Sequence, residues 1–135
     1  KKYFQAARKH LKPGGAFVLD IYGGPDAQIE STEERDMEGF TYIWEQGPYN
    51  AFNANAKRYI HFRFPDGTEM RKAFIYDWRI WSLPEVQDLL YEAGFSEVAL
   101  YWEGCDEDGD GNGVFRRVRK VENEECWIAY IVAWR

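Results

Sequence analysis

The sequence has few of the residues that metal sites, disulfide frameworks and the common nucleophilic enzymes require. It contains two cysteines and two histidines in 135 residues. Cys105 and Cys126 cannot form a disulfide framework or a zinc site of four ligands, so we expect two free thiols in a reducing compartment. The motifs H-E-x-x-H, G-x-S-x-G and G-x-x-x-x-G-K-[ST] are absent. Zinc peptidases, α/β-hydrolases and P-loop enzymes that carry these motifs are therefore excluded.

Long apolar runs and a basic surplus are also missing. No apolar run approaches the roughly 18 to 20 residues that a membrane span needs, and residues 1–10 lack the apolar centre of a signal peptide. Because 17 basic residues face 23 acidic ones, the net charge is −6, which argues against binding to a nucleic-acid backbone. We therefore expect a cytoplasmic protein with no membrane or nucleic-acid partner. The basic cluster at 116–120 is explained most simply as a solvated face.

What is present begins as one domain of mixed α/β type. Residues 2–11 have apolar side chains at helical spacing, and Pro13 and Gly14 follow as stop signals. Residues 16–22 form a nearly continuous apolar run, which suits a strand that is covered on both faces, as in a parallel sheet. Residues 25–39 are polar and acidic, and we expect a loop with at most one helical turn.

The middle of the chain, residues 40–81, predicts an antiparallel β meander that is rich in aromatic side chains. The segment Gly47-Pro48-Tyr49-Asn50 has the composition of a turn. Pro65-Asp66-Gly67 separates two alternating runs, which is a strong hairpin signal. We expect about three strands, at 40–45, 57–64 and 68–76.

The last part predicts a helix and two core strands. Ser82 and Glu85 have the spacing of a capping box, and Gly94 suits the left-handed position that ends a helix. A strand is expected at 97–102, where its connection through a helix favours a right-handed parallel crossover from residues 16–22. Residues 126–134 form the most apolar strand, which should lie centrally in the sheet.

Three stretches of the sequence resemble one enzyme family. LKPGGAFVLDIY, at 11–22, resembles the L-K-P-G-G-x-hydrophobic stretch that leads into the fifth strand of class I S-adenosylmethionine-dependent methyltransferases. LPEVQDLLYEAGFSEVALYWEG, at 83–104, resembles the next helix and the sixth strand, where L-x-x-A-G-F is common. CWIAYIVAWR, at 126–135, resembles the closing seventh strand. The resemblance covers almost the whole chain in the family's order.

The resemblance implies a Rossmann-like α/β sheet and a missing half. The family's strand order, 3-2-1-4-5-7-6 with strand seven antiparallel, would insert 126–134 between 16–22 and 97–102. Residues 40–81 stand where the family often has an insert that covers the substrate. The family holds S-adenosylmethionine with a glycine-rich turn and an acidic residue near its first two strands, and neither is found here. We therefore expect the C-terminal half of a methyltransferase domain, which does not bind the cofactor alone.

Several residues are candidates for contact with a substrate. The segment 76–81 is expected to connect the insert to the helix, beside the carboxyl ends of strands where ligands bind in α/β sheets. Arg79 could hold a carboxylate or phosphate, and Tyr76, Trp78 and Trp81 could form a cage for an apolar or cationic group. Packing of these aromatic side chains into a core is the alternative.

Further candidates lie on the predicted strands. Tyr22 follows the first core strand at its carboxyl end. His61 and Arg63 share the polar face of a meander strand, where His61 could act as a general base or, more commonly, be an exposed strand residue. No catalytic residue is assigned, because methyl transfer can proceed by positioning the nucleophile and the sulfonium in line.

The acidic loop resembles a calcium site only in part. Asp106, Asp108 and Asp110 match the first ligand positions of an EF-hand, but the twelfth position is Arg117 instead of a bidentate glutamate. We expect no metal and a mobile, solvated loop between two strands. A looser site completed by a glutamate at 122, 124 or 125 is the weaker alternative.

Two other functions and one assembly state remain open. The aromatic meander could serve a stand-alone module that binds a ligand or a partner, or the chain could be a calcium-binding or purely structural domain. A small-molecule methyl acceptor is the partner expected of the methyltransferase. Because the strand at 16–22 would lose a neighbour in an isolated half, we also expect a homodimer formed through that edge or through the apolar surface that the missing half would cover.

Overall fold

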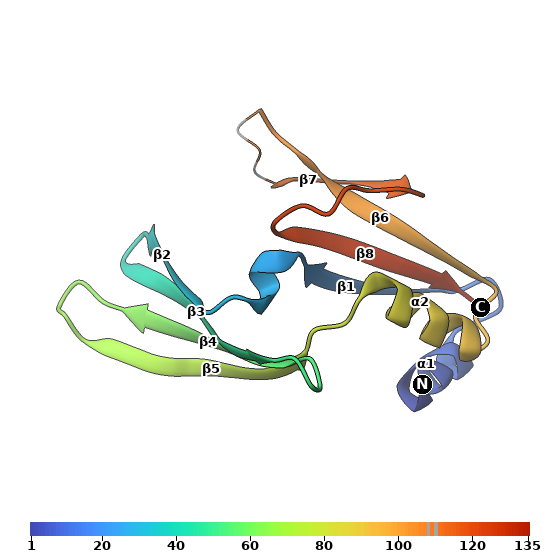
Figure 1. The fold of residues 1–135 in the computed structure, drawn as a ribbon, viewed down its shortest axis with the longest axis horizontal. Coiled ribbons are helices and arrows are strands. Elements are labelled where there is room, and N and C mark those ends of the chain that lie inside the picture. Colours follow the sequence, from blue (N-terminus) through green and yellow to red (C-terminus); the bar gives the residue numbers. More distant parts are fainter. Residues whose placement is uncertain (108, 110) are drawn as a thin grey trace. The chain divides into compact units, whose positions relative to one another are not determined.

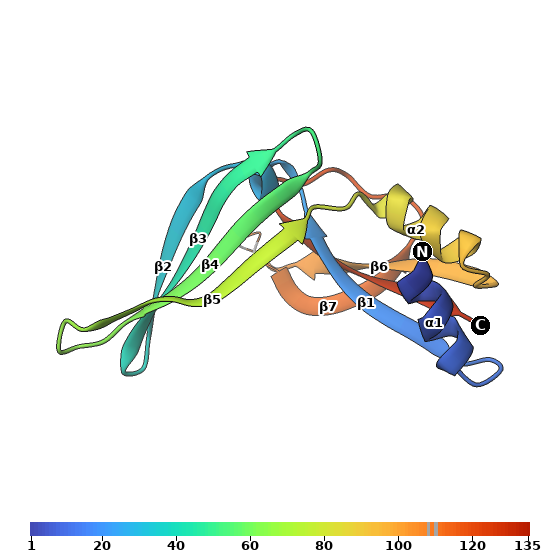
Figure 2. The same cartoon turned by 90° about the horizontal axis from the view of Figure 1, so that it is seen from below.

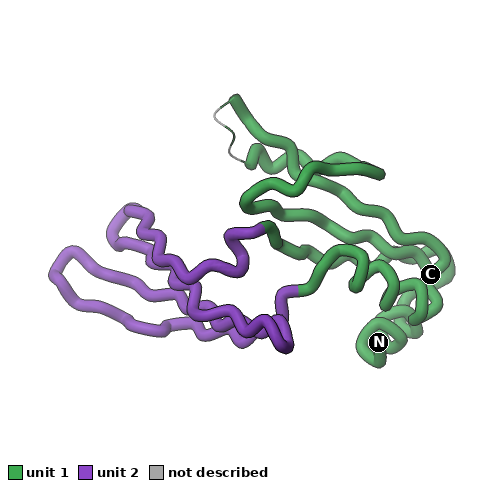
Figure 3. Tube along the Cα trace, in the orientation of Figure 1, with its two compact units in different colours: residues 1–24, 81–135 green, residues 25–80 purple. Residues whose placement is uncertain are grey.

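The structure is a computed structural model that describes residues 1–107, 109 and 111–135. The chain divides into two compact units (Figure 3). Unit 1 consists of residues 1–24 and 81–135, and unit 2 consists of residues 25–80. Unit 2 therefore contains most of the predicted insert and also the residues 25–39 that precede it.

Unit 1 contains a four-stranded sheet in the order β1-β8-β6-β7 (Figure 1). Its strands are β1 (Ala16–Gly23), β6 (Glu97–Cys105), β7 (Gly111–Val118) and β8 (Trp127–Trp134). Strand β8 pairs antiparallel with both β1 and β6. Strands β1 and β6 consequently run in the same direction with β8 between them, where residues 126–134 were expected.

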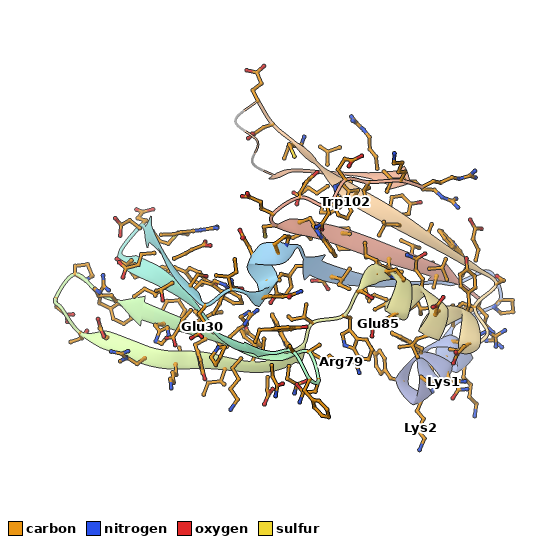
Figure 4. All side chains as sticks on the ribbon, in the orientation of Figure 1. Lys1, Lys2, Glu30, Arg79, Glu85 and Trp102 are labelled. Atoms are coloured by element: carbon orange, nitrogen blue, oxygen red, sulfur yellow. The ribbon has the colours of Figure 1, made fainter. Side chains whose placement is uncertain are left out.

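Two helices cover one face of this sheet: α1 (Lys2–His10) and α2 (Leu83–Glu92) (Figure 2). The core beneath them includes Leu90 and Ile131, which are both fully buried. Both helices were expected from the sequence. Helix α2 begins at the predicted capping box, in which Glu85 N–H donates to Ser82 Oγ and Ser82 N–H donates to the Glu85 carboxylate. Lys1, which precedes α1 and is labelled in Figure 4, donates from Nζ to Glu92 Oε2 of α2 at 2.9 Å and so joins the two helices.

The expectation that β1 is covered on both faces is wrong for the chain as described. Exposure alternates along the strand, and Val18 is 55 % exposed whereas Phe17 and Leu19 pack into the core. The reason is that both helices pack on the same side of the sheet. Within the described residues, β8 is also the only strand that pairs with β1.

Unit 2 contains a second four-stranded antiparallel sheet, in the order β2-β3-β4-β5 (Figure 1). Its elements are the 3-10 helix η1 (Pro25–Gln28), β2 (Ser31–Met37), β3 (Phe40–Asn50), β4 (Asn55–Arg63) and β5 (Glu69–Arg79). The predicted helical turn within 25–39 is present as η1, but the prediction of a loop is wrong for β2. The meander therefore has four strands instead of three. Strand β2 is polar on both faces because it is an edge strand, paired with β3 alone.

The two predicted turns of unit 2 differ in outcome. The Pro65-Asp66-Gly67 hairpin is confirmed, since Phe64 N–H donates to Thr68 O across it. The predicted turn at 47–50 is wrong, because β3 continues to Asn50. An irregularity in the ladder between Gln46 and Tyr49 accommodates Pro48, which has no N–H to donate.

Part of the predicted acidic loop is also a strand. Residues 111–113 belong to β7, which pairs with β6 from Gly111 opposite Cys105 to Val118 opposite Leu100. Asp108 and Asp110 lie outside the described residues. Among the residues that are described, no helix is long and apolar enough to cross a membrane.

Candidate functional site

The carboxyl ends of β1 and β6 meet the start of β8 at one edge of the sheet in unit 1. Such an edge is where ligands bind in open α/β sheets. Gly23 is the last residue of β1 and lies opposite Trp127, the first residue of β8. A Cβ atom added to Gly23 would lie 2.4 Å from the Trp127 indole, so the ring lies directly over the glycine.

Trp127 forms an aromatic pair with Trp102 of β6 at this edge. The ring centroids are 5.0 Å apart and the planes are inclined by 37°. Trp102 is 8 % exposed, and its Nε1–H donates a long hydrogen bond of 3.4 Å to the Glu124 carboxylate (Figure 4). The edge therefore combines flat aromatic surface with one carboxylate, a combination that suits a cationic or aromatic group.

Gly24 closes the edge through a tight contact with the segment before β8. Its φ of +103° lies in the region that side chains rarely adopt, and an added Cβ would lie 2.3 Å from Glu125 O. The Gly23-Gly24 turn is thus filled by the protein's own backbone and by an indole. It does not form an open cradle of N–H groups for a phosphate or a cofactor.

Tyr22 does not join the Trp102–Trp127 pair. It lies opposite Ile128 on β8, one residue away from the Gly23–Trp127 pair. Because successive strand residues point to opposite faces, the half-buried Tyr22 side chain lies on the face that the helices do not cover. Its role as a substrate contact stays a prediction.

The aromatic candidates from segment 76–81 belong to different units. Tyr76 and Trp78 lie on β5, not in a connection, and their rings are 4.6 Å apart. Trp44 of β3 is 6.4 Å from Trp78 on the same face, a neighbour that the alternating pattern of residues 40–45 could have revealed. Trp81 packs against the core of unit 1. Arg79 is the last residue of β5 and is exposed (Figure 4).

Two buried polar residues in the sheet of unit 2 were not foreseen. Arg58 is fully buried, pairs with Tyr76 in the β4–β5 ladder and donates from Nη2 to Ala27 O at 2.5 Å. Gln46 Nε2 donates to Asp26 O at 2.9 Å. Both side chains therefore fasten η1 to the sheet. Arg58 shares its strand face with Ile60 and Phe62, and a cation on an apolar face was the signal that could have found it.

His61 is buried, which corrects the expectation of an exposed strand residue. Its Nδ1 accepts a hydrogen bond from Lys72 N–H at 3.1 Å, so Nδ1 carries no proton and Nε2 does. Nε2 lies 2.9 Å from Glu45 Oε2, at an angle unfavourable for a hydrogen bond. Neither nitrogen offers a free lone pair in this arrangement, so the geometry lends no support to a general base.

Arg63 is held by two carboxylates on the polar face of the sheet. Its Nη1 and Nη2 donate to Glu34 at 2.9 and 2.8 Å, and its Nε donates to Glu69 at 3.2 Å. These bonds raise the pKa of Arg63, and the bond from Arg63 lowers the pKa of Glu34 below its ordinary value of 4.5. A substrate anion would have to displace these carboxylates to reach the guanidinium.

Of the three aspartates proposed as calcium ligands in the acidic loop, the structure describes only Asp106. Asp106 is exposed, and its carbonyl accepts a bond from Gly109 N–H. Asp108 and Asp110 are outside the described residues. In residues 1–107, 109 and 111–135, no group of three or more His, Cys, Asp or Glu side chains could hold a metal ion. Cys105 and Cys126 both have exposed side chains.

Comparison with known proteins gives a fold. No protein-family model matches the sequence, and no curated protein matches it. The CcbJ methyltransferase from Streptomyces caelestis is similar in structure, with a TM-score of 0.60 and 16% identity over 96% of this chain and 47% of its own. An S-adenosylmethionine-dependent methyltransferase from Clostridium acetobutylicum ATCC 824 is also similar, with a TM-score of 0.58 and 21% identity over 98% of this chain and 49% of its own.

This chain therefore spans about half the length of each solved neighbour. At 16% and 21% identity the likeness is one of fold, and both neighbours are methyltransferases. The chain has a methyltransferase fold, shared with S-adenosylmethionine-dependent methyltransferases over about half of their length.

Proposed function

We propose that this chain is the C-terminal, substrate-side portion of an S-adenosylmethionine-dependent methyltransferase that acts on a small-molecule acceptor. The observation that carries the proposal is the match of nearly the whole chain to two methyltransferases, with TM-scores of 0.60 and 0.58. The proposal assigns β1, β8 and β6 to the fifth, seventh and sixth strands of the family sheet. Unit 2 then corresponds to the insert after the fifth strand.

The order of β1, β8 and β6 supports this assignment. A last strand that enters antiparallel between two parallel strands is what the sequence resemblance implies, and β8 has that position. The LKPGG phrase directly precedes β1. The AGF phrase lies between α2 and β6. Sequence phrases and strand order are independent features, and both favour the same family.

In this proposal the chain binds and orients the acceptor instead of activating it chemically. Trp102 and Trp127 would supply flat contact surface at the carboxyl edge of unit 1, and Glu124 would attract a positively charged or hydrogen-bonding group. In unit 2, Tyr76 and Trp78 are separate candidates for contact with a substrate. Holding the acceptor in line with the donor and excluding water accounts for a large part of the rate enhancement available to such a reaction.

The residues of this chain do not fit the cofactor. The Gly23-Gly24 turn is filled by Trp127 and Glu125, and no G-x-G-x-x-G follows a strand. S-adenosylmethionine, which supplies an electrophilic methyl group when bound, would be held by other parts of the full-length protein. No step of the reaction is assigned to a residue of this chain.

The test is a labelled-methyl assay with the full-length gene product. Incubation with a donor labelled in its methyl group and a panel of small-molecule amines, phenols and carboxylic acids should transfer label to at least one acceptor. This chain alone should transfer none. If the native protein begins at Lys1 and binds no donor, the enzyme proposal fails, and the alternative of a stand-alone binding module is favoured.

The Tyr76–Trp78 stack is the observation that favours that alternative. A stacked aromatic pair in which Trp78 is 37 % exposed can bind a ligand without chemistry. Both functions predict weaker ligand binding after Trp78→Ala. Only the enzyme proposal predicts turnover, which separates the two.

A further inference from the structure

Unit 1 has a groove of about 330 Å³ beside α2, on an edge of the sheet that the proposed function does not use. Helix α2 packs on β6, whereas β7 extends the sheet by one more strand. The residues that line the groove include the apolar Val98 and Leu100 of β6, Val118 at the end of β7, and Val121. Residues of α2, β6 and β7 therefore all contribute to the lining of the groove.

The lining of this groove also includes basic residues. Arg117, Arg119 and Lys120 line it, together with Gln87 of α2. Arg117 is neutralised by an ion pair with Glu97. Arg119 and Lys120 make no ion pair or hydrogen bond with any residue in the described part of the chain. In a protein with a net charge of −6, two uncompensated cations at one hollow create a local positive potential.

We propose that this groove binds a small amphipathic anion, with a carboxylate or phosphate head on a short apolar body. Ligand sites of a few hundred Å³ typically combine apolar walls with a few oriented polar groups, and this groove has both. Arg119 and Lys120 would bind the anionic head, and Gln87 would donate a hydrogen bond to it. The valine and leucine side chains that line the groove would contact the apolar body. A purely solvated basic face would need no apolar hollow beneath it.

The experiment titrates the whole 135-residue chain with octanoate and octyl phosphate at fixed ionic strength, followed by calorimetry and amide chemical shifts. Acetate and inorganic phosphate test the head alone, and octyltrimethylammonium tests the apolar body with the opposite charge. Both octyl anions should bind saturably, with shifts centred on residues 98–100 and 118–121. Acetate, inorganic phosphate and the cationic probe should bind at least about tenfold more weakly, because each lacks one of the two interactions.

Two charge-reversal variants decide whether the groove itself is the site. The double variant Arg119→Glu with Lys120→Glu should weaken the binding of both octyl anions about tenfold or more. Arg116→Glu is the matched control, because Arg116 is exposed and belongs to the same basic cluster but does not line the groove. It should change the binding by less than about threefold, because Arg116 does not line the groove and salt screens a charge that is not in contact with the ligand. Unchanged circular dichroism checks that both variants fold.

Vesicles of phosphatidylglycerol form a separate arm that identifies the source of the anion. We expect no vesicle binding and therefore a free metabolite, whereas vesicle binding that depends on Arg119 and Lys120 would support a lipid headgroup in the same groove. Three results would overturn the proposal: no saturable binding of either octyl anion, equal binding of inorganic phosphate and octyl phosphate, or an equal loss in the Arg116→Glu control.

Discussion

Nδ1 of the buried His61 accepts a hydrogen bond of 3.1 Å from the backbone N–H of Lys72. The β4–β5 ladder is irregular at this point, between Ile60 and Phe62, and Lys72 has a positive φ of 52°. The imidazole thus replaces a backbone acceptor where the two strands lose register. His61 holds a bulge in the sheet that carries Tyr76 and Trp78.

His61→Ala should destabilise the chain by about 1–3 kcal/mol, because it leaves a partly buried N–H group without an acceptor. The measurement is urea unfolding followed by circular dichroism. His61→Asn should recover part of the loss, since its amide oxygen can accept the same bond. His10→Ala is the control, because His10 is exposed on α1 and should change stability by less than about 0.5 kcal/mol. Equal effects of His10→Ala and His61→Ala would contradict this role.

The Arg63–Glu34 pair should make stability depend on acid pH. Because the bond from Arg63 lowers the folded-state pKa of Glu34, the pair stabilises the fold above the ordinary value of 4.5. This contribution is lost as the pH falls through the lowered pKa. Glu34→Gln should therefore flatten the decline in stability below pH 4.5, measured by urea unfolding at a series of pH values.

Glu38→Gln is the matched control for this pH profile. Glu38 is exposed at the β2–β3 turn and has no ion pair with any residue that the structure describes. Its substitution should leave the acid limb of the profile unchanged. A wild-type slope in Glu34→Gln would show that the pair contributes nothing.

Gly24→Ala should destabilise unit 1 through a steric clash at the carboxyl edge of the sheet. The added Cβ would lie 2.3 Å from Glu125 O and the residue would keep a strained φ of +103°. Gly39→Ala has a similar φ of +88° but open space around the new Cβ, so it isolates the cost of φ alone. Thermal unfolding should show a loss at Gly24 that exceeds the loss at Gly39 by at least about 1 kcal/mol. Equal losses of stability in Gly24→Ala and Gly39→Ala would contradict the clash, because they would show that the backbone at Glu125 moves away from residue 24 without cost.

The exposed face and outer edge of β1 should drive self-association of this chain. Val18 of β1, together with Ile128 and Tyr130 of β8, is exposed on the face away from the helices. Sedimentation equilibrium should detect a dimer at high micromolar concentration, and Val18→Asp should weaken it at least about tenfold. Ile29→Asp changes a similarly exposed residue outside the strands and should not. A monomer at all concentrations would contradict the predicted homodimer.

The parts of the fold that could be predicted are those with strong local signals. Helix α2 has its cap, apolar face and terminal glycine within fourteen consecutive positions, 82–95, so little depends on distant residues. Strand β8 could be predicted because residues 127–134 form a highly apolar run. Its residues Ala129, Ile131 and Ala133 are fully buried in the structure. Such elements carry their own signal whatever their neighbours are.

The parts that escaped prediction depend on pairing with other strands. Strand β2 reads STEERDM, which is polar on both faces and forms a strand only because β3 supplies its hydrogen-bond partners. Strand β7 likewise follows an acidic, glycine-rich stretch and is defined by β6. The buried Arg58 and His61 depend on contacts with residues 27 and 72, which no local pattern contains. Their burial could be suspected from alternation, but their partners could not.

We propose that this chain is the half of a methyltransferase that does not hold the cofactor. Calorimetric titration of S-adenosylmethionine into this chain and into the full-length gene product tests it most directly. We expect saturable binding to the full-length protein and none to residues 1–135. Saturable binding to residues 1–135 alone, or no binding to either protein, would contradict it.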